Sequence, residues 1–271
     1  MTHFKEFGIM QKRLPFVISA PHCSSRVPPD IRRSLALTDQ EIEESTDIGT
    51  KEIFGALPAV GVFCASWSRL AVDLNRNPDQ RDRKGVVAHV DYNGRSIYRE
   101  DDLPDADEVE RRIRDYYSPY HQQLRSALDR PEAACLFDCH SLFGTGPPEA
   151  PDPGETRKDI TLSNNGDQEG LAVPGLGSTT CPAGLLNAIK ETFEDSGFSV
   201  SLNRPYKGGY ITTHYGRTLF EKGKMALQIE INQDLYCAPG TLELAPDRVK
   251  EVRERINHVF TKIGMMTAKH V

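Results

Sequence analysis

The sequence predicts an α/β fold built in layers, because two patterns alternate along its 271 residues. Short apolar runs, each bounded by proline, glycine or polar residues, are typical of buried strands. The longer segments between them carry apolar residues at helical spacing, which is typical of amphipathic helices. Strands that alternate with helices pack as a sheet covered by helices, so we expect a layered α/β architecture.

The expected strands are short. They centre on apolar runs at residues 16–18, 60–63, 135–137, 198–200 and 226–229.

Helices are expected near residues 105–130, 182–196 and 245–264. A further helical stretch begins after Thr38 and reaches Leu57. Thr38 and Glu41 have the Thr-x-x-Glu spacing of a capping box, a pattern that marks the start of a helix.

A chain of this length forms either one such domain or two smaller ones, and we treat residues 1–271 as a single domain. Residues 144–182 are rich in proline, glycine, aspartate and asparagine. That composition favours a long surface loop over core structure, and the loop is a candidate lid over a binding site.

The overall charge excludes some kinds of partner. The formal net charge is -6, whereas a general nucleic-acid surface needs a basic excess. No signal peptide is recognisable near the N-terminus, and no run is long and apolar enough for a membrane span. The six cysteines are dispersed without paired metal spacing, which indicates reduced thiols. We therefore expect a cytoplasmic protein.

Four segments place a chemically able residue directly after an apolar run that we expect to be a strand. Ligands of open α/β sheets gather at the carboxyl ends of strands, so these segments are expected to meet in one pocket. The segments are 16–22 ending in His22, 70–76 ending in Arg76, 135–141 containing His140, and 226–232 containing Glu230.

Two strand-end histidines, far apart in sequence, are the arrangement that a catalytic zinc ion needs. An acidic residue would complete three protein ligands and leave one position open for water. Asp47 is the candidate third ligand, because it lies in a helical stretch soon after His22. Zinc lowers the pKa of a bound water and makes it a nucleophile, and Glu230 would carry the proton to the leaving amine.

Each of these assignments has a structural alternative. A lone histidine is more often a hydrogen-bonded structural residue than a metal ligand. Asp47 has the alternative of a solvated or capping aspartate. Glu230 has the alternative of a structural ion pair with lysine or arginine, since buried charges are normally paired.

The chain resembles the N-formylglutamate amidohydrolase family, and the resemblance rests on six motifs in a fixed order. Each motif is weak alone, whereas the ordered set is specific. The motifs are SAPH at 19–22, AVDLNRNP at 71–78, YHQQL at 120–124, DCHS at 138–141, KGGYITTHYG at 207–216 and QIEINQDLY at 228–236.

The resemblance implies a three-layer sandwich with a central mixed β-sheet, similar to the zinc carboxypeptidases. It further implies one zinc ion and the hydrolysis of N-formyl-L-glutamate to formate and L-glutamate in histidine degradation. By position, the zinc ligands would be His22, Asp47 and His140, and the general acid–base residue would be Glu230.

The same resemblance implies that Asn75 and Arg76 form a carboxylate clamp, a task that suits the planar fork of arginine. The substrate has two carboxylates, so a second polar or cationic group is needed. The candidates are Arg69, Lys207, Tyr210, His214 and Arg217. The Gly208-Gly209 step allows a close backbone approach to a ligand, with a simple turn as the alternative.

The sequence departs from the family pattern after the first histidine. The family commonly has a small residue and then glycine, where this chain has Cys23 followed by Ser24. Three other functions therefore stay open. They are a metal-dependent hydrolase of another N-acyl amino acid or short peptide, a hydrolase with Cys23 or Ser141 as nucleophile, and a binding protein without catalysis.

Overall fold

A six-stranded β-sheet lies at the centre of the computed structural model, which describes residues 13–267. The strand order is β2-β1-β3-β6-β4-β5. Strands β1, β2, β3 and β6 are parallel, whereas β4 runs antiparallel to β6 and parallel to β5. The strand bounds are β1 Leu14–Ala20, β2 Ala59–Cys64, β3 Cys135–Leu142, β4 Ile160–Ser163, β5 Val200–Leu202 and β6 Met225–Asn232.

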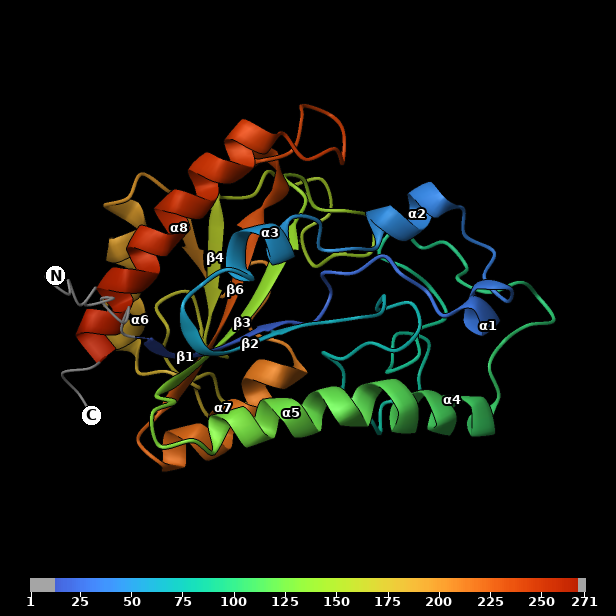
Figure 1. Cartoon of the computed structure of the whole chain (residues 1–271), viewed down its shortest axis with the longest axis horizontal. Helices are drawn as coiled ribbons and strands as arrows, with labels where there is room; N and C mark the ends of the chain where they lie inside the picture. Colours follow the sequence, from blue (N-terminus) through green and yellow to red (C-terminus); the bar gives the residue numbers. More distant parts are fainter. Residues whose placement is uncertain (1–12, 268–271) are drawn as a thin grey trace, which may run out of the picture.

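Helices cover both faces of this sheet, which confirms the three-layer α/β prediction with a mixed sheet (Figure 1). One face carries α3 (Thr50–Phe54), α6 (Ala183–Glu194) and α8 (Pro246–Thr267). The other face carries α5 (Ser118–Leu128) and α7 (Tyr210–Glu221). Successive strand residues point to opposite faces, so Phe16 and Ile18 pack with the first group while Val17 packs with the second.

Helix α5 is the end of a longer rod. Helix α4 (Ala106–Arg112) and a π-helical turn η1 (Ile113–Tyr117) precede it without a break. In Figure 1 this green rod extends beyond the sheet and passes beneath the irregular segments that follow β2. A second apolar cluster fills this part of the molecule, and it includes Leu70, Val72 and Tyr117.

Two short helices precede α3 in the chain. They are α1 (Pro29–Arg32) and α2 (Asp39–Glu44). The predicted capping box is confirmed, because Thr38 Oγ1 accepts from the Glu41 amide and Glu41 accepts from the Thr38 amide.

The single helix expected from Thr38 to Leu57 is wrong, because α2 and α3 are separate. Gly49 stands between them at a φ of +82°, and a Cβ there would lie 2.4 Å from the ring of Tyr236. Only glycine adopts this conformation at so small a distance without strain. The break places Asp47 in a turn, not in a helix.

Two further predictions need correction, one of a strand and one of a loop. Residues 70–72 form turns, and their apolar side chains serve the second apolar cluster instead of the sheet. Residues 144–182 are not one continuous surface loop, because they contain the fully buried strand β4. That strand has only four residues and depends on pairing with β5 and β6, so its sequence alone gives little signal.

The remaining elements agree with the sequence in different degrees. The expected strands at 16–18, 60–63, 135–137 and 226–229 are confirmed, and the strand expected at 198–200 begins only at Val200. The helices expected near 105–130, 182–196 and 245–264 are confirmed, whereas α7 was not predicted. Within residues 13–267, no helix has both the length and the apolar character needed to cross a membrane.

Replacement of Phe260 by alanine is expected to destabilise the protein by about 3–5 kcal/mol. The fully buried Phe260 ring packs edge-on against Phe137 with centroids 4.9 Å apart, and it also contacts Phe16 and Phe54. Chemical denaturation would measure the change. The matched control is Phe220→Ala on α7, whose ring is 44% exposed, and equal losses from the two variants would contradict the expectation.

Candidate metal centre and substrate cavity

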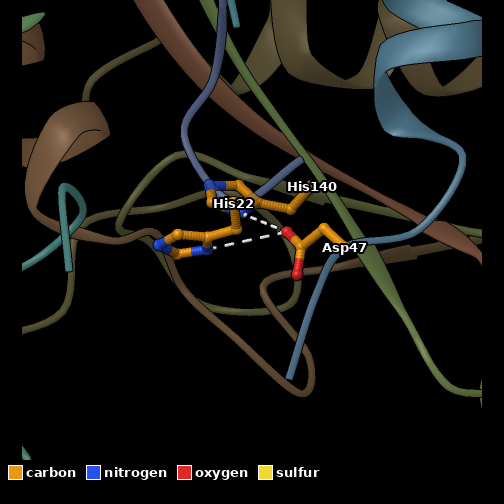
Figure 2. Close-up of side chains that lie close together, drawn as sticks. All are labelled: His22, Asp47 and His140. Carbon is orange, nitrogen blue, oxygen red and sulfur yellow. Dashed lines mark hydrogen bonds and ion pairs between the residues drawn. The ribbon is translucent and has the colours of Figure 1, made fainter. Parts of the chain in front are cut away.

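Three side chains converge at the carboxyl ends of the parallel strands β1 and β3 (Figure 2). His22 follows β1 by two residues, His140 lies on β3, and Asp47 comes from the turn between α2 and α3. The Asp47 amide donates to the His22 carbonyl at 3.0 Å, which holds this turn against the strand end. One potential ligand atom from each residue lies within 4.8 Å of the others, so the predicted trio is brought together.

The Nδ1 atoms of both histidines face the same carboxylate oxygen. Asp47 Oδ2 lies 2.8 Å from His140 Nδ1 and 3.6 Å from His22 Nδ1. Among the described residues, His22 Nδ1 is buried without a hydrogen-bond partner. A buried nitrogen of this kind is costly unless something binds it, and a metal ion at this point would satisfy it.

The opposite nitrogens of the two rings face other buried carboxylates, which sequence reasoning did not single out. His22 Nε2 lies 2.7 Å from Asp73 Oδ1, and His140 Nε2 lies 3.1 Å from Asp138 Oδ2. A carboxylate only accepts, so Asp73 places the proton of His22 on Nε2 and leaves the Nδ1 lone pair free. The sequence signal that could have identified Asp138 was its spacing from His140, since residues two apart on a strand share a face.

Asp47 and Asp73 are held ionised. Burial alone would raise the pKa of Asp47, but the hydrogen bond with His140 and the charge interactions with both histidines outweigh burial and lower it. Asp73 shows the same balance, in which Arg69 and His22 lower its pKa against the effect of burial.

Glu230 has a different environment. It stands beside His140, because the two residues are in register on β6 and β3. Gln228 Nε2 donates to Glu230 Oε1 at 2.9 Å, and no lysine or arginine of residues 13–267 forms an ion pair with it. Burial therefore dominates and raises the pKa of Glu230 to about 8, although His140 acts in the opposite direction. The described residues therefore do not form the structural ion pair that was the alternative for Glu230.

These residues line a cavity of about 290 Å³. His22, Asp47, His140 and Glu230 all contribute to its wall, together with the backbone of Gly208 and Gly209. The rest of its lining includes four cations, two acids and two tyrosines, which are Arg69, Arg76, Lys84, Arg157, Glu44, Glu149, Tyr92 and Tyr206.

The four cations differ in how tightly each is paired with a carboxylate. The nitrogen of Arg76 nearest to Asp73 is 3.9 Å away, and this guanidinium otherwise donates to the Tyr92 hydroxyl and the Lys84 carbonyl. The other cations form ion pairs of 2.6 Å, which are Arg69 with Asp73, Lys84 with Glu149 and Arg157 with Asp152. Arg76 is thus the cation with the weakest internal partner.

Arg157 was missed from the sequence. It lies in the 144–182 segment, which was expected to be a surface loop, yet its side chain is 3% exposed. Asp152 binds it through two hydrogen bonds of 2.6 and 2.8 Å, and Tyr206 packs beneath the guanidinium. Nothing in the local sequence distinguishes this arginine from a solvated one.

Tyr210 and His214 are not among the residues that line the cavity, and their role in substrate binding stays a prediction. Both lie on α7, where their rings stack on each other with centroids 4.7 Å apart. Helix α7 begins at Tyr210, directly after the Gly208-Gly209 backbone that does line the cavity. Lys207 and Arg217 are exposed and do not line the cavity either.

Asn75 supports the centre from behind. Its Oδ1 accepts from the Ile211 amide at 2.7 Å, and its Nδ2 lies 3.0 Å from His140 Nε2. The backbone of Gly209 approaches it so closely that a Cβ there would lie 2.2 Å from Asn75 Nδ2. Close packing against Asn75 thus explains the second glycine of the Gly208-Gly209 step.

The thiol and hydroxyl proposed as alternative nucleophiles lack an adjacent base among the described residues. Cys23 Sγ faces the Ala65 carbonyl, and its hydrogen bond with Cys64 and its burial raise the pKa of the Cys23 thiol. Ser141 Oγ accepts from Gln233 and donates to the Ile48 carbonyl. Neither group contacts a histidine through a hydrogen bond in this part of the chain, so neither has the geometry of an activated nucleophile.

Comparison with known proteins identifies the family. The family model described as N-formylglutamate amidohydrolase matches residues 14–237. The chain belongs to this family. The resemblance indicated by the six motifs is therefore confirmed, and with it the expectation that this is an amide-bond hydrolase at the level of the family.

Known relatives align with most of the length of this chain. It is 31% identical over 241 residues to the N-formylglutamate deformylase of Pseudomonas aeruginosa, which covers 83% of this chain and 82% of the relative. It is 28% identical over 249 residues to the N-formylglutamate deformylase of Pseudomonas putida, over 86% and 85% of the two chains. The crystal structure of N-formylglutamate amidohydrolase from Ralstonia eutropha JMP134 has the same fold, with a TM-score of 0.77, 22% identity and 97% of each chain covered.

Substitution of Gly209 by alanine is expected to destabilise this amidohydrolase family member by about 1–3 kcal/mol, because the added methyl overlaps Asn75 and forces it to move. Thermal and chemical denaturation would measure the loss. Gly184→Ala in α6 is the control, since nothing lies within 4 Å of the added Cβ there. A Gly209→Ala variant as stable as Gly184→Ala would show that the overlap is relieved without cost.

Proposed function

We propose that this chain is a zinc-dependent amidohydrolase that cleaves N-formyl-L-glutamate, or a closely related N-acyl amino acid, to formate and L-glutamate. The observation that carries the proposal is the convergence of His22, Asp47 and His140 on a cavity lined by cations. The two Pseudomonas relatives, both N-formylglutamate deformylases, support the same substrate. We also propose that the reaction belongs to histidine degradation, as the family resemblance implies, and that it takes place in the cytoplasm, as expected from the sequence.

The donor set suits a zinc ion. Neutral imidazole nitrogens and a carboxylate oxygen are the usual ligands of catalytic zinc, and three protein ligands leave a position open. His22 Nδ1, His140 Nδ1 and Asp47 Oδ2 would hold the ion, while Asp73 and Asp138 orient the rings from behind. When bound, zinc would polarise the substrate carbonyl and lower the pKa of water.

Glu230 is suited to carry the proton of the reaction. Hydrolysis of an amide removes a proton from the attacking water and delivers one to the departing nitrogen. A carboxyl group whose pKa burial raises to about 8 can accept the first proton and donate it again. Gln228 holds one oxygen of Glu230, which keeps the carboxyl group directed at the cavity beside His140.

The cations of the cavity are suited to the carboxylates of the substrate. Arg76 has the weakest internal ion pair, so its fork can bind a carboxylate with two hydrogen bonds. Arg69 and Arg157 add positive charge, although each is already paired with an aspartate. The small cavity volume, about 290 Å³, fits a substrate of the size of N-formylglutamate better than a long peptide.

The proposal is tested by zinc analysis together with a formate-release assay on purified protein. We expect N-formyl-L-glutamate to be hydrolysed in preference to N-formyl derivatives with uncharged side chains. Folded protein that releases no formate after zinc addition would overturn the proposal. Efficient turnover of N-acyl amino acids with uncharged side chains would instead favour the broader hydrolase.

His140→Ala is expected to lose zinc binding and formate release, because one of three ligands is removed. Zinc content after dialysis, measured by atomic emission, checks this. His214→Ala is the matched control, since His214 is exposed on α7 and lies outside the cavity. If both variants retained equal zinc, the metal centre would lie elsewhere.

Glu230→Gln is expected to lower kcat by about 10²–10⁴-fold while zinc content stays at the level of the unaltered protein. The amide keeps the shape of the carboxyl group but cannot take up a proton. Steady-state kinetics on N-formyl-L-glutamate measures the effect. An unchanged kcat would remove Glu230 from the proton-transfer role.

Arg76→Ala is expected to lower kcat/KM by about 10–100-fold, which corresponds to the loss of a hydrogen bond to a charged group. The effect should be strongest in KM, because the lost contact already exists in the bound substrate. Arg217→Ala on α7 serves as the control, since this arginine is exposed and distant from the cavity lining. An equal effect of the two substitutions would argue against the clamp.

A further inference from the structure

The segment Asp73–Arg76 carries three residues of the proposed site but belongs to no helix or strand. Asp73 contacts His22, Asn75 contacts His140, and Arg76 lines the cavity. Residues of a regular element are held by its hydrogen-bond ladder, whereas this segment needs other partners. The source of those partners therefore decides where the three side chains point.

Each carbonyl of the segment has one partner, and two of the four partners are side chains of a single helical rod. Tyr117, the last residue of η1, donates its hydroxyl to the Arg76 carbonyl at 2.9 Å. His121 on α5 lies with Nε2 at 2.9 Å from the Leu74 carbonyl. The other two carbonyls accept backbone amides, Asp73 from Arg76 and Asn75 from Tyr210.

The two side chains form one rigid unit. Residues 117 and 121 are four apart, so they share a face of the rod, and their rings stack with centroids 4.0 Å apart. Both are more than nine-tenths buried. The π-helical turn that ends at Tyr117 changes the phase of the rod at this point, and such turns are rare and concentrated at functional sites.

The tautomer of His121 is fixed by its two partners. The Leu74 carbonyl only accepts, so Nε2 carries the proton, and Nδ1 is then the acceptor for the Tyr215 hydroxyl at 2.9 Å. Burial lowers the pKa of His121 to about 4, although its bond with the Leu74 carbonyl opposes that change. His121 is therefore a neutral donor to the segment at physiological pH.

We propose that Tyr117 and His121 are positioning residues that set the direction of Asn75 and Arg76 by holding the carbonyls of Leu74 and Arg76. The proposal explains a part of the YHQQL motif, at 120–124, that the chemistry of the cavity does not use. It rests on the proposed function for the meaning of Arg76 as a substrate clamp. The hold on the segment itself does not depend on that function.

Two variants separate the hydrogen bonds from the packing. Tyr117→Phe removes the hydroxyl that donates to the Arg76 carbonyl and keeps the stacked ring. His121→Gln keeps a donor close to the position of Nε2, whereas His121→Phe removes it. Leu124→Ala is the control, because Leu124 is fully buried one turn further along α5 and makes no contact with the segment through a hydrogen bond.

The first measurement is hydrogen exchange of the amides of Asp73, Asn75 and Arg76 in the metal-free protein. We expect exchange to be about three- to tenfold faster in Tyr117→Phe and His121→Phe, the effect of one lost hydrogen bond. Exchange in His121→Gln should stay near that of the unaltered protein. Unchanged exchange in both phenylalanine variants, or equal acceleration in Leu124→Ala, would overturn the proposal.

The second measurement is KM for N-formyl-L-glutamate. It should rise about three- to tenfold in Tyr117→Phe with a smaller change in kcat, and it should rise no further when Tyr117→Phe is added to Arg76→Ala. Additive effects in this double-mutant cycle would overturn the link to Arg76. An unaltered protein that releases no formate would refute the proposed function, while the exchange measurement would still decide this inference.

Discussion

Buried charge is the constraint on which the rest of this structure depends. Asp47, Asp73 and Asp138 are all buried around two histidines, and an unpaired buried carboxylate would destabilise the fold. Each acquires a partner only because separate parts of the chain end at one edge of the sheet. The parallel arrangement of β1 and β3 supplies that edge, and the close turn at Gly49 brings Asp47 to it. The pairing of these carboxylates with the two histidines therefore stabilises the fold and also forms the site.

Glu230 is in a different position, because no ion-pair partner for it lies among residues 13–267. It lies on the strand next to His140, Gln228 is the donor to its carboxyl group in this part of the chain, and burial raises its pKa. A group that must take up and release a proton needs a pKa shifted towards neutrality. A carboxylate that binds a metal instead needs a low pKa that keeps it ionised. The proposed metal centre and Glu230 thus lie side by side on β3 and β6. The first would hold the metal ion, and the second would transfer the proton.

Support for the site extends well beyond the residues that line the cavity. Asp73, Asn75 and Arg76 lie on a segment without regular structure, and it is held by side chains of the η1–α5 rod and by the start of α7. Gly209 packs against Asn75 so closely that no larger residue fits without movement. The cationic lining likewise depends on carboxylates behind it, with Arg157 fixed by Asp152.

The sequence by itself determined the layered α/β class, four of the strands and the helical segments near 105–130, 182–196 and 245–264, because burial on a sheet face or helix face leaves a periodic pattern. It also indicated His22, His140 and Glu230, since each follows an apolar strand or lies near its carboxyl end. Only the tertiary structure decided the rest. Strand β4 exists through its neighbours β5 and β6, Tyr210 and His214 lie on α7 outside the cavity lining, and Arg157 reaches the cavity from an irregular segment. These features depend on contacts between residues distant in the chain, which leave no periodic signal in the local sequence.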